Sequence, residues 1–163
     1  MKRKNYEILN KKIHSHGFER ILRVINNSVT LAIFVFYPSL LVFLFLAGYE
    51  DFLKMVLVPL TAFIAVTAAR YFINAKRPYE IMDITPVTNR VKSGKSFPSR
   101  HVFSIIMIAL CCFNINTVLG IILLILSVVL AVLRVVCGAH FIKDVLAGAA
   151  IAAVAFIIGF IIL

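Results

Sequence analysis

Long apolar runs separated by short polar breaks make up most of the chain, and this pattern predicts its helices. Residues 24–49 and 52–75 form two such runs, with a polar turn around Glu50 between them. Because roughly 20 apolar residues cross the hydrocarbon layer of a bilayer, each run predicts one transmembrane helix.

The second half of the chain has no charged residue between His101 and Arg134, which is too long a stretch for one ordinary span. Asn114 and Asn116 supply a polar break inside it. We therefore predict a short third span and two further spans, at about 99–113, 117–137 and 141–163. Gly138 can end the fourth span as a C-terminal cap.

The first 23 residues follow a different pattern, because Lys and Arg are interleaved there with apolar residues. This pattern predicts an amphipathic interfacial helix at 1–23 that lies on the membrane surface. The apolar run that follows is too long for the apolar part of a signal peptide, which has roughly 7–15 residues. We expect an all-α integral membrane helical bundle, a single domain over 1–163, with about five transmembrane helices after the surface helix.

The amino-acid composition also indicates that the chain is surrounded by lipid rather than by water. Of the 163 residues, 62% are hydrophobic and the mean hydropathy is +1.02, whereas soluble domains contain about 45–50% apolar residues. The formal net charge of +10 is clustered, which favours local sites and membrane-surface contact over nucleic-acid binding. The three cysteines have no metal-type spacing, so we expect buried, reduced thiols. The expected location is the cell membrane, as a multi-pass protein.

The loop 76–97 is the one long polar stretch after the N-terminal tail, and it is longer than connections usually are without a function. We predict that it is an active-site loop. With five spans, this loop, the N-terminal tail and the turn 138–140 all face one side, whereas the C-terminus faces the other. Residues far apart in sequence then gather at the first side: Arg70, Arg77, His101, Arg134, His140 and Asp144.

The spacing of these residues indicates chemistry on an anion. His140 and Asp144 are i,i+4 neighbours, so the carboxylate can hold the imidazole. Ser99 begins the third span, where free backbone N–H groups and the positive end of the helix dipole attract an anion. Several cations with two histidines and one carboxylate are typical of phosphoryl transfer, in which cations neutralise the phosphate oxygens.

Three sequence blocks resemble the type 2 phosphatidic acid phosphatase family, which shares its site with vanadium haloperoxidases. The first block is Arg70, six residues, then Arg77-Pro78. The second is Pro98-Ser99-Arg100-His101, in which Arg100 replaces the family's glycine. The third is Leu133-Arg134, five residues, His140, three residues and Asp144, in which Leu133 replaces a serine. The high hydropathy excludes a soluble haloperoxidase.

The resemblance implies a role for each matching residue. His140 corresponds to the nucleophile that forms a phosphohistidine, Asp144 orients its ring, and His101 corresponds to the general acid and base. The family requires no metal or other cofactor. The implied phosphate-binding residues are Arg70, Arg77, Ser99, Arg100 and Arg134.

The implied function is hydrolysis of a lipid phosphate or diphosphate. The candidate substrates are a polyprenyl diphosphate, which we favour by analogy, phosphatidic acid and phosphatidylglycerol phosphate. Two alternatives stay open: a lipid phosphotransferase, and a non-catalytic membrane protein that binds anionic lipid. The side of the membrane also stays open, because the basic tail favours a cytoplasmic site whereas bacterial relatives often act on the outer face.

Overall fold

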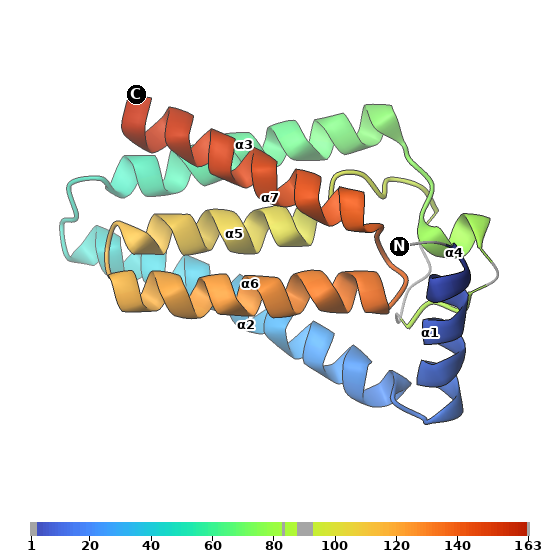
Figure 1. Ribbon diagram of the computed structural model, residues 1–163. Helices are drawn as coiled ribbons and strands as arrows, with labels where there is room; N and C mark the ends of the chain where they lie inside the picture. The colour runs from blue at the N-terminus through green and yellow to red at the C-terminus, as the bar shows by residue number, and fades with distance from the viewer. Residues whose placement is uncertain (1–2, 83, 88–92, 163) are drawn as a thin grey trace.

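The computed structural model describes residues 3–82, 84–87 and 93–162, and this part of the chain is helical without any strand (Figure 1). The prediction of an all-α bundle is confirmed. Residues 83 and 88–92 of the expected active-site loop lie outside the described residues. The elements are α1 (Arg3–Ser15), α2 (Glu19–Leu46), α3 (Phe52–Ile73), α4 (Pro78–Ile81), α5 (Arg100–Phe113), α6 (Thr117–Val136), α7 (Ile142–Phe156) and the π-helical continuation η1 (Ile157–Ile162).

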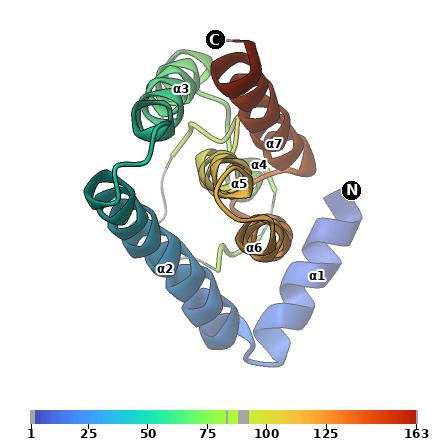
Figure 2. The same cartoon turned by 90° about the vertical axis from the view of Figure 1, so that its left-hand side faces the viewer.

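Within the residues that the structure describes, four stretches are long and apolar enough to cross a membrane: Glu19–Leu46, Phe52–Ile81, Thr117–Val136 and Ile142–Ile162. The remaining predicted span, the short third one, corresponds to α5 and has only 14 residues. Figure 2 shows why a short helix suffices there, because α5 lies in the middle of the bundle with α2, α3, α6 and α7 around it. Protein rather than lipid surrounds α5, so its length need not match the bilayer.

The N-terminal region differs from the predicted 1–23 surface helix in its boundary. Helix α1 ends at Ser15, the chain turns at Gly17 with φ of 67°, and α2 begins at Glu19. Glycine adopts this left-handed conformation without a Cβ penalty, which explains the break. Residues 19–23 therefore form the first turn of the first spanning helix.

Helix α1 lies across one end of the bundle and is fixed to the protein (Figure 1). The Asn10 side chain donates to the Thr85 carbonyl at 2.7 Å and accepts from the Thr85 amide at 3.0 Å. Ile13 packs in a buried cluster with Val87 and Cys137. One face of α1 therefore covers the loop 84–87 and the turn after α6.

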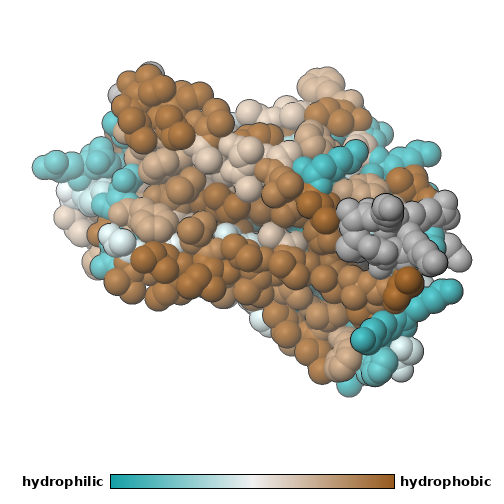
Figure 3. Space-filling model, viewed as in Figure 1, coloured by the Kyte–Doolittle hydropathy of each residue, from teal (hydrophilic) through white to brown (hydrophobic). Residues whose placement is uncertain are grey.

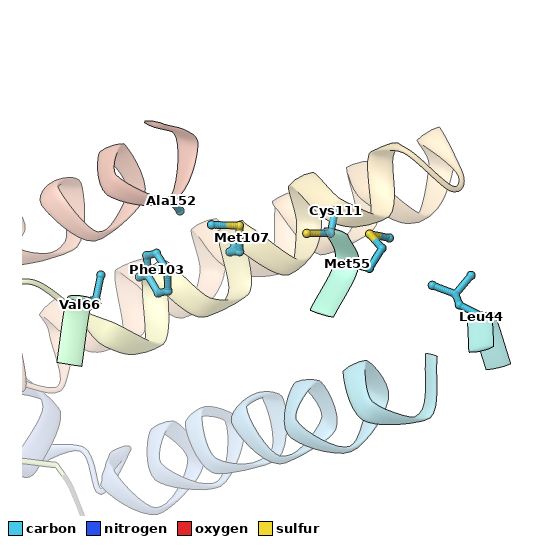
Figure 4. Packing of buried hydrophobic residues seen from close by; sticks show 7 residues of the cluster. All are labelled: Leu44, Met55, Val66, Phe103, Met107, Cys111 and Ala152. Carbon is cyan, nitrogen blue, oxygen red and sulfur yellow. The ribbon is translucent and has the colours of Figure 1, made fainter. Parts of the chain in front are cut away.

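The main hydrophobic core follows the length of α5. Figure 4 shows Phe103, Met107 and Cys111 of α5 meeting side chains from the surrounding helices, and the cluster comprises Leu44, Met55, Val66, Phe103, Met107, Cys111 and Ala152. Large hydrophobic side chains are exposed along the spanning helices, and on the face that Figure 3 shows the polar residues gather towards the two ends of the bundle. The cysteines are free and buried, as expected.

The chain alternates between the two ends of the bundle as predicted. Helices α1 and α4 and the α6–α7 turn lie at one end, whereas the α2–α3 and α5–α6 turns and the C-terminal end of η1 lie at the other (Figure 1). The end that carries α1 and α4 therefore brings together the loop 76–97 and the turn 138–140.

Close packing of α7 against the start of α5 depends on Gly148. A Cβ atom at this position would lie 2.6 Å from the Ser99 carbonyl oxygen and 3.3 Å from the Phe103 amide nitrogen. Both are backbone atoms, so the two helices would have to move apart.

We expect Gly148→Ala to lower the free energy of unfolding by about 1–3 kcal/mol, the usual effect of an overpacked core. Thermal unfolding in detergent measures this as a lower Tm. The matched control is Ala150→Val, on an exposed position of the same helix, which should leave the Tm unchanged. An unchanged Tm in Gly148→Ala would contradict the close approach of α5 and α7.

Candidate active site

A polar cavity of about 780 Å³ opens at the end of the bundle that carries α1 and α4. Its walls come from α2, α3, α5, α6 and the loop before α5, so it is assembled from distant parts of the sequence. Six of the eight residues predicted to form the site line this cavity: Arg70, Arg77, Arg100, His101, Arg134 and His140.

Asp144 lies directly behind this cavity and is fully buried. Its Oδ2 atom accepts a hydrogen bond from the Ser96 hydroxyl at 2.5 Å and from the Phe141 amide at 3.0 Å. The Nδ1 atom of His140 lies 3.6 Å from the same oxygen and 3.4 Å from the Ser96 hydroxyl. Both contacts are made by Nδ1, so they orient the imidazole ring without using Nε2.

The turn after α6 brings the backbone of His140 into contact with that of Arg134. Gly138 has φ of 70°, and the amides of Ala139 and His140 both donate to the Arg134 carbonyl at 3.1 Å. The left-handed glycine reverses the chain just past the helix end, as its position predicted. His140 is therefore fixed by its backbone as well as by its ring.

Backbone carbonyls hold two of the cavity arginines. Arg70 donates to the Ser96 carbonyl at 3.4 Å and, more closely, to the Pro98 carbonyl. Arg77 donates from Nε to the Gly94 carbonyl at 3.0 Å and from Nη1 to the Ala139 carbonyl at 3.2 Å. These uncharged partners orient the guanidinium groups without neutralising them.

Arg134 and Arg100 contact hydroxyl groups instead. Arg134 donates to the Thr30 hydroxyl at 3.3 Å, and its buried Nε has no partner. Arg100 donates to the Thr67 hydroxyl at 3.4 Å, and its guanidinium lies 5.3 Å from the centre of the Phe63 ring.

None of these four arginines takes part in an ion pair within the described residues. The ion pairs found there join Glu19 to His14 and to Arg23, and Asp144 to His140. Buried or half-buried cations are normally paired, because taking an unpaired charge out of water is unfavourable. The unpaired positive charge of these four arginines therefore favours the binding of an anion in the cavity.

Ser99 and His101 lie at the start of α5. Ser99 is the residue before the helix, but its hydroxyl makes no capping bond and is buried without a partner, and its amide donates to the Asp144 carbonyl at 2.8 Å. Ser99 therefore ties α5 to α7 and does not line the cavity. His101 lines the cavity and is half-buried.

Several polar residues of the site were not singled out in the sequence. Ser96 binds Asp144 from the loop before α5, and Asn26, Asn27 and Thr30 of α2 line the cavity. The polar pair 26–27 within an otherwise apolar span is a signal that could have been used.

An acidic residue fixes the loop that carries Arg77. Glu80 accepts from the Arg77 amide at 2.6 Å, from the Ser93 hydroxyl at 2.7 Å and from the Gly94 amide at 3.0 Å with each carboxylate oxygen. Glu80 joins the two ends of the loop, which positions the Gly94 carbonyl for Arg77.

A second, apolar groove of about 550 Å³ runs between α2, α3 and α5 and joins the polar cavity. Thr30, Phe34, Arg100 and His101 line both spaces. The remaining lining is almost entirely apolar and includes Ile33, Leu41, Leu60, Phe63, Phe103 and Met107.

Residues 51–163 match the family model described as the PAP2 superfamily. This stretch carries α3 to η1 and most of the residues around the cavity, whereas the part of the cavity wall from α2 lies before it. The chain belongs to the PAP2 superfamily. The family named from the sequence resemblance is therefore confirmed.

Two solved structures show the same fold as this PAP2 chain. LpxE of Aquifex aeolicus is 24% identical with a TM-score of 0.76, and the match covers 96% of this chain and 92% of that one. The first transmembrane PAP2 type phosphatidylglycerolphosphate phosphatase from Bacillus subtilis is 23% identical with a TM-score of 0.60, and the match covers 93% and 89%. No curated protein sequence matches the chain.

The surroundings of His140 predict a neutral imidazole at neutral pH. Burial lowers the pKa of His140 below its ordinary value, the Asp144 contact raises it in part, and the nearby Arg77 and Arg70 lower it. The net direction is downward.

We expect a pKa for His140 below the usual value of about 6.5, and a still lower pKa in Asp144→Asn, which loses the carboxylate that favours the protonated ring. Titration of the histidine ring signals by NMR in detergent micelles measures both values. His140→Ala assigns the signal by its disappearance. A His140 signal that titrates at or above 6.5 would contradict the electrostatics described.

Proposed function

We propose that this PAP2 protein is a membrane phosphatase that hydrolyses a lipid phosphate or diphosphate through a phosphohistidine intermediate, without a metal ion. The observation that carries the proposal is that the polar cavity and the apolar groove join. A cavity with four arginines and two histidines opens into an apolar groove between membrane-spanning helices. An amphiphile with an anionic head and an apolar tail matches both.

In the proposed first step, Arg70, Arg77 and Arg134 hold the phosphoryl oxygens, and Nε2 of His140 attacks phosphorus. The bond between phosphorus and the leaving oxygen breaks, and its electron pair stays on that oxygen. His101, which also lines the cavity, donates the proton to it. Asp144 supports the positive charge that develops on the His140 ring.

In the second step a water molecule attacks the phosphohistidine. His101 now acts as the base and takes a proton from this water, and the bond between Nε2 and phosphorus breaks. Inorganic phosphate leaves and both histidines return to their starting states. The three arginines act throughout by stabilising charge on the phosphoryl oxygens, which is the main requirement of phosphoryl transfer.

The lipid nature of the substrate is supported by the groove and by one relative. The groove is bounded by helices with apolar outer faces, and such a space favours a hydrocarbon tail. A relative of the same fold is described as a phosphatidylglycerolphosphate phosphatase. Polyprenyl diphosphate, phosphatidic acid and phosphatidylglycerol phosphate all combine the required head and tail, and the proposed location is the cell membrane.

His140→Ala removes the proposed nucleophile. We expect phosphate release from a lipid phosphate in detergent micelles to fall by on the order of 10³-fold or more, because the loss of a nucleophile removes the covalent pathway. The wild-type protein should also form an acid-labile phosphohistidine and be inhibited by vanadate.

His16→Ala serves as the matched control, because His16 is exposed beyond the end of α1 and lines neither space. This variant should keep full activity. Full activity in His140→Ala would refute the mechanism, and a protein that binds lipid but shows neither turnover nor the trapped intermediate would be a non-catalytic binder.

Ser104 lies half-buried in the lining of the groove, so Ser104→Trp should fill it. We expect KM for a long-chain lipid phosphate to rise about tenfold or more, because the tryptophan side chain occupies the space of the hydrocarbon tail. For a short-chain, water-soluble phosphate, which has no tail in the groove, kcat/KM should stay within about threefold of the wild-type value. Ser39→Trp, an exposed position outside the groove, is the control. Equal effects on both substrates would contradict a tail-binding groove.

A further inference from the structure

Arg100 occupies the position at which the family motif has glycine, so its side chain adds a cation to the site. The side chain extends from the start of α5 towards α3, where it meets the Thr67 hydroxyl at 3.4 Å and the face of Phe63. Both partners are uncharged, and the single hydrogen bond is long. The guanidinium thus keeps most of its donors for another group.

The position of Arg100 differs from that of the other site arginines. Among the arginines in the described ranges, Arg100 alone lines both the polar cavity and the apolar groove. Arg70, Arg77 and Arg134 line the polar cavity only. Arg100 therefore lies where the polar cavity and the apolar groove meet, whereas the other three arginines lie in the polar cavity alone.

A lipid diphosphate has a charged group at this same place along its length. Its distal phosphoryl group is the one removed, its apolar tail fills the groove, and the proximal phosphate links the two. A lipid monophosphate has only an ester oxygen and neutral groups at the junction. An arginine there has a charged partner only when the proximal phosphate is present.

Resting on the proposed function, we infer that Arg100 binds the proximal phosphate of a lipid diphosphate and makes this protein selective for diphosphates over monophosphates. When Nε2 of His140 bonds to the distal phosphorus, the bond from that phosphorus to the bridging oxygen breaks. The electron pair stays on the bridging oxygen, which becomes a terminal oxygen of the departing lipid monophosphate and takes the proton of His101. Arg100 stabilises the negative charge that grows on this leaving group.

The test compares an isoprenyl diphosphate with the monophosphate of the same alcohol, so that the tail is constant. We expect Arg100→Gln to lower kcat/KM for the diphosphate by about 10- to 100-fold, the usual effect of losing a charge-assisted hydrogen bond. The monophosphate should change by less than about threefold, and Arg100→Lys should recover part of the diphosphate activity. Retained monophosphate hydrolysis shows that the variant is folded.

Arg20→Gln is the matched control, because Arg20 is exposed on α2 and lines neither space; it should leave the ratio of the two kcat/KM values unchanged. Equal losses on both substrates, or no loss on either, in Arg100→Gln would overturn the inference while leaving the phosphatase proposal intact. A wild-type protein that hydrolyses neither of these substrates, and neither phosphatidic acid nor phosphatidylglycerol phosphate, would instead reject the phosphatase proposal.

A binding measurement tests the same inference without turnover. In the His140→Ala background, the affinity for the isoprenyl diphosphate should exceed that for the monophosphate, and adding Arg100→Gln should reduce this preference about tenfold or more. An unchanged preference would overturn the role of Arg100, whatever the activity assays show.

Discussion

The carboxylate and the backbone of Asp144 hold together the parts of the chain that form the site. Its side chain binds Ser96 from the loop and lies beside His140, and its carbonyl accepts the Ser99 amide at the start of α5. Because Asp144 is fully buried, these contacts act without competition from water. The arginines of the cavity remain unpaired with carboxylates in the described part of the chain, so the one negative charge of Asp144 can support the proposed nucleophile, His140, without neutralising them.

Most of the fold could be predicted from the sequence, because a helix that crosses the lipid needs roughly 20 consecutive apolar residues. The apolar runs gave the spanning helices to within a few residues, and the break at 114–116 separated α5 from α6. The boundary between α1 and α2 was less accurate. The charged residues at 19–23 resemble the surface helix before them in composition. Only the left-handed conformation of Gly17 shows that the helix ends there and that residues 19–23 belong to α2.

The candidate site was predictable where a residue's type is costly in a membrane, and less so elsewhere. Arginines, histidines and Asp144 stand out in an apolar chain, and six of the eight predicted residues line one cavity. Ser96 did not stand out, because small polar residues are common in loops, whereas Asn26 lies within an apolar span and was a signal that the prediction did not use. Ser99 matched its motif, yet its amide is used to join two helices, which no spacing along the chain indicates.

The attachment of α1 to the loop has a consequence for how the protein is assembled during synthesis. Asn10 and Thr85 are separated by 75 positions, and the Thr30–Arg134 contact spans 104. Helix α1 precedes α6 and the turn that holds Cys137 in the chain, so it is synthesised well before them. The packing of Ile13 against Cys137 and the contact of Thr30 with Arg134 can therefore form only after α6 has been made, and contacts between such distant positions are intrinsically slow to form.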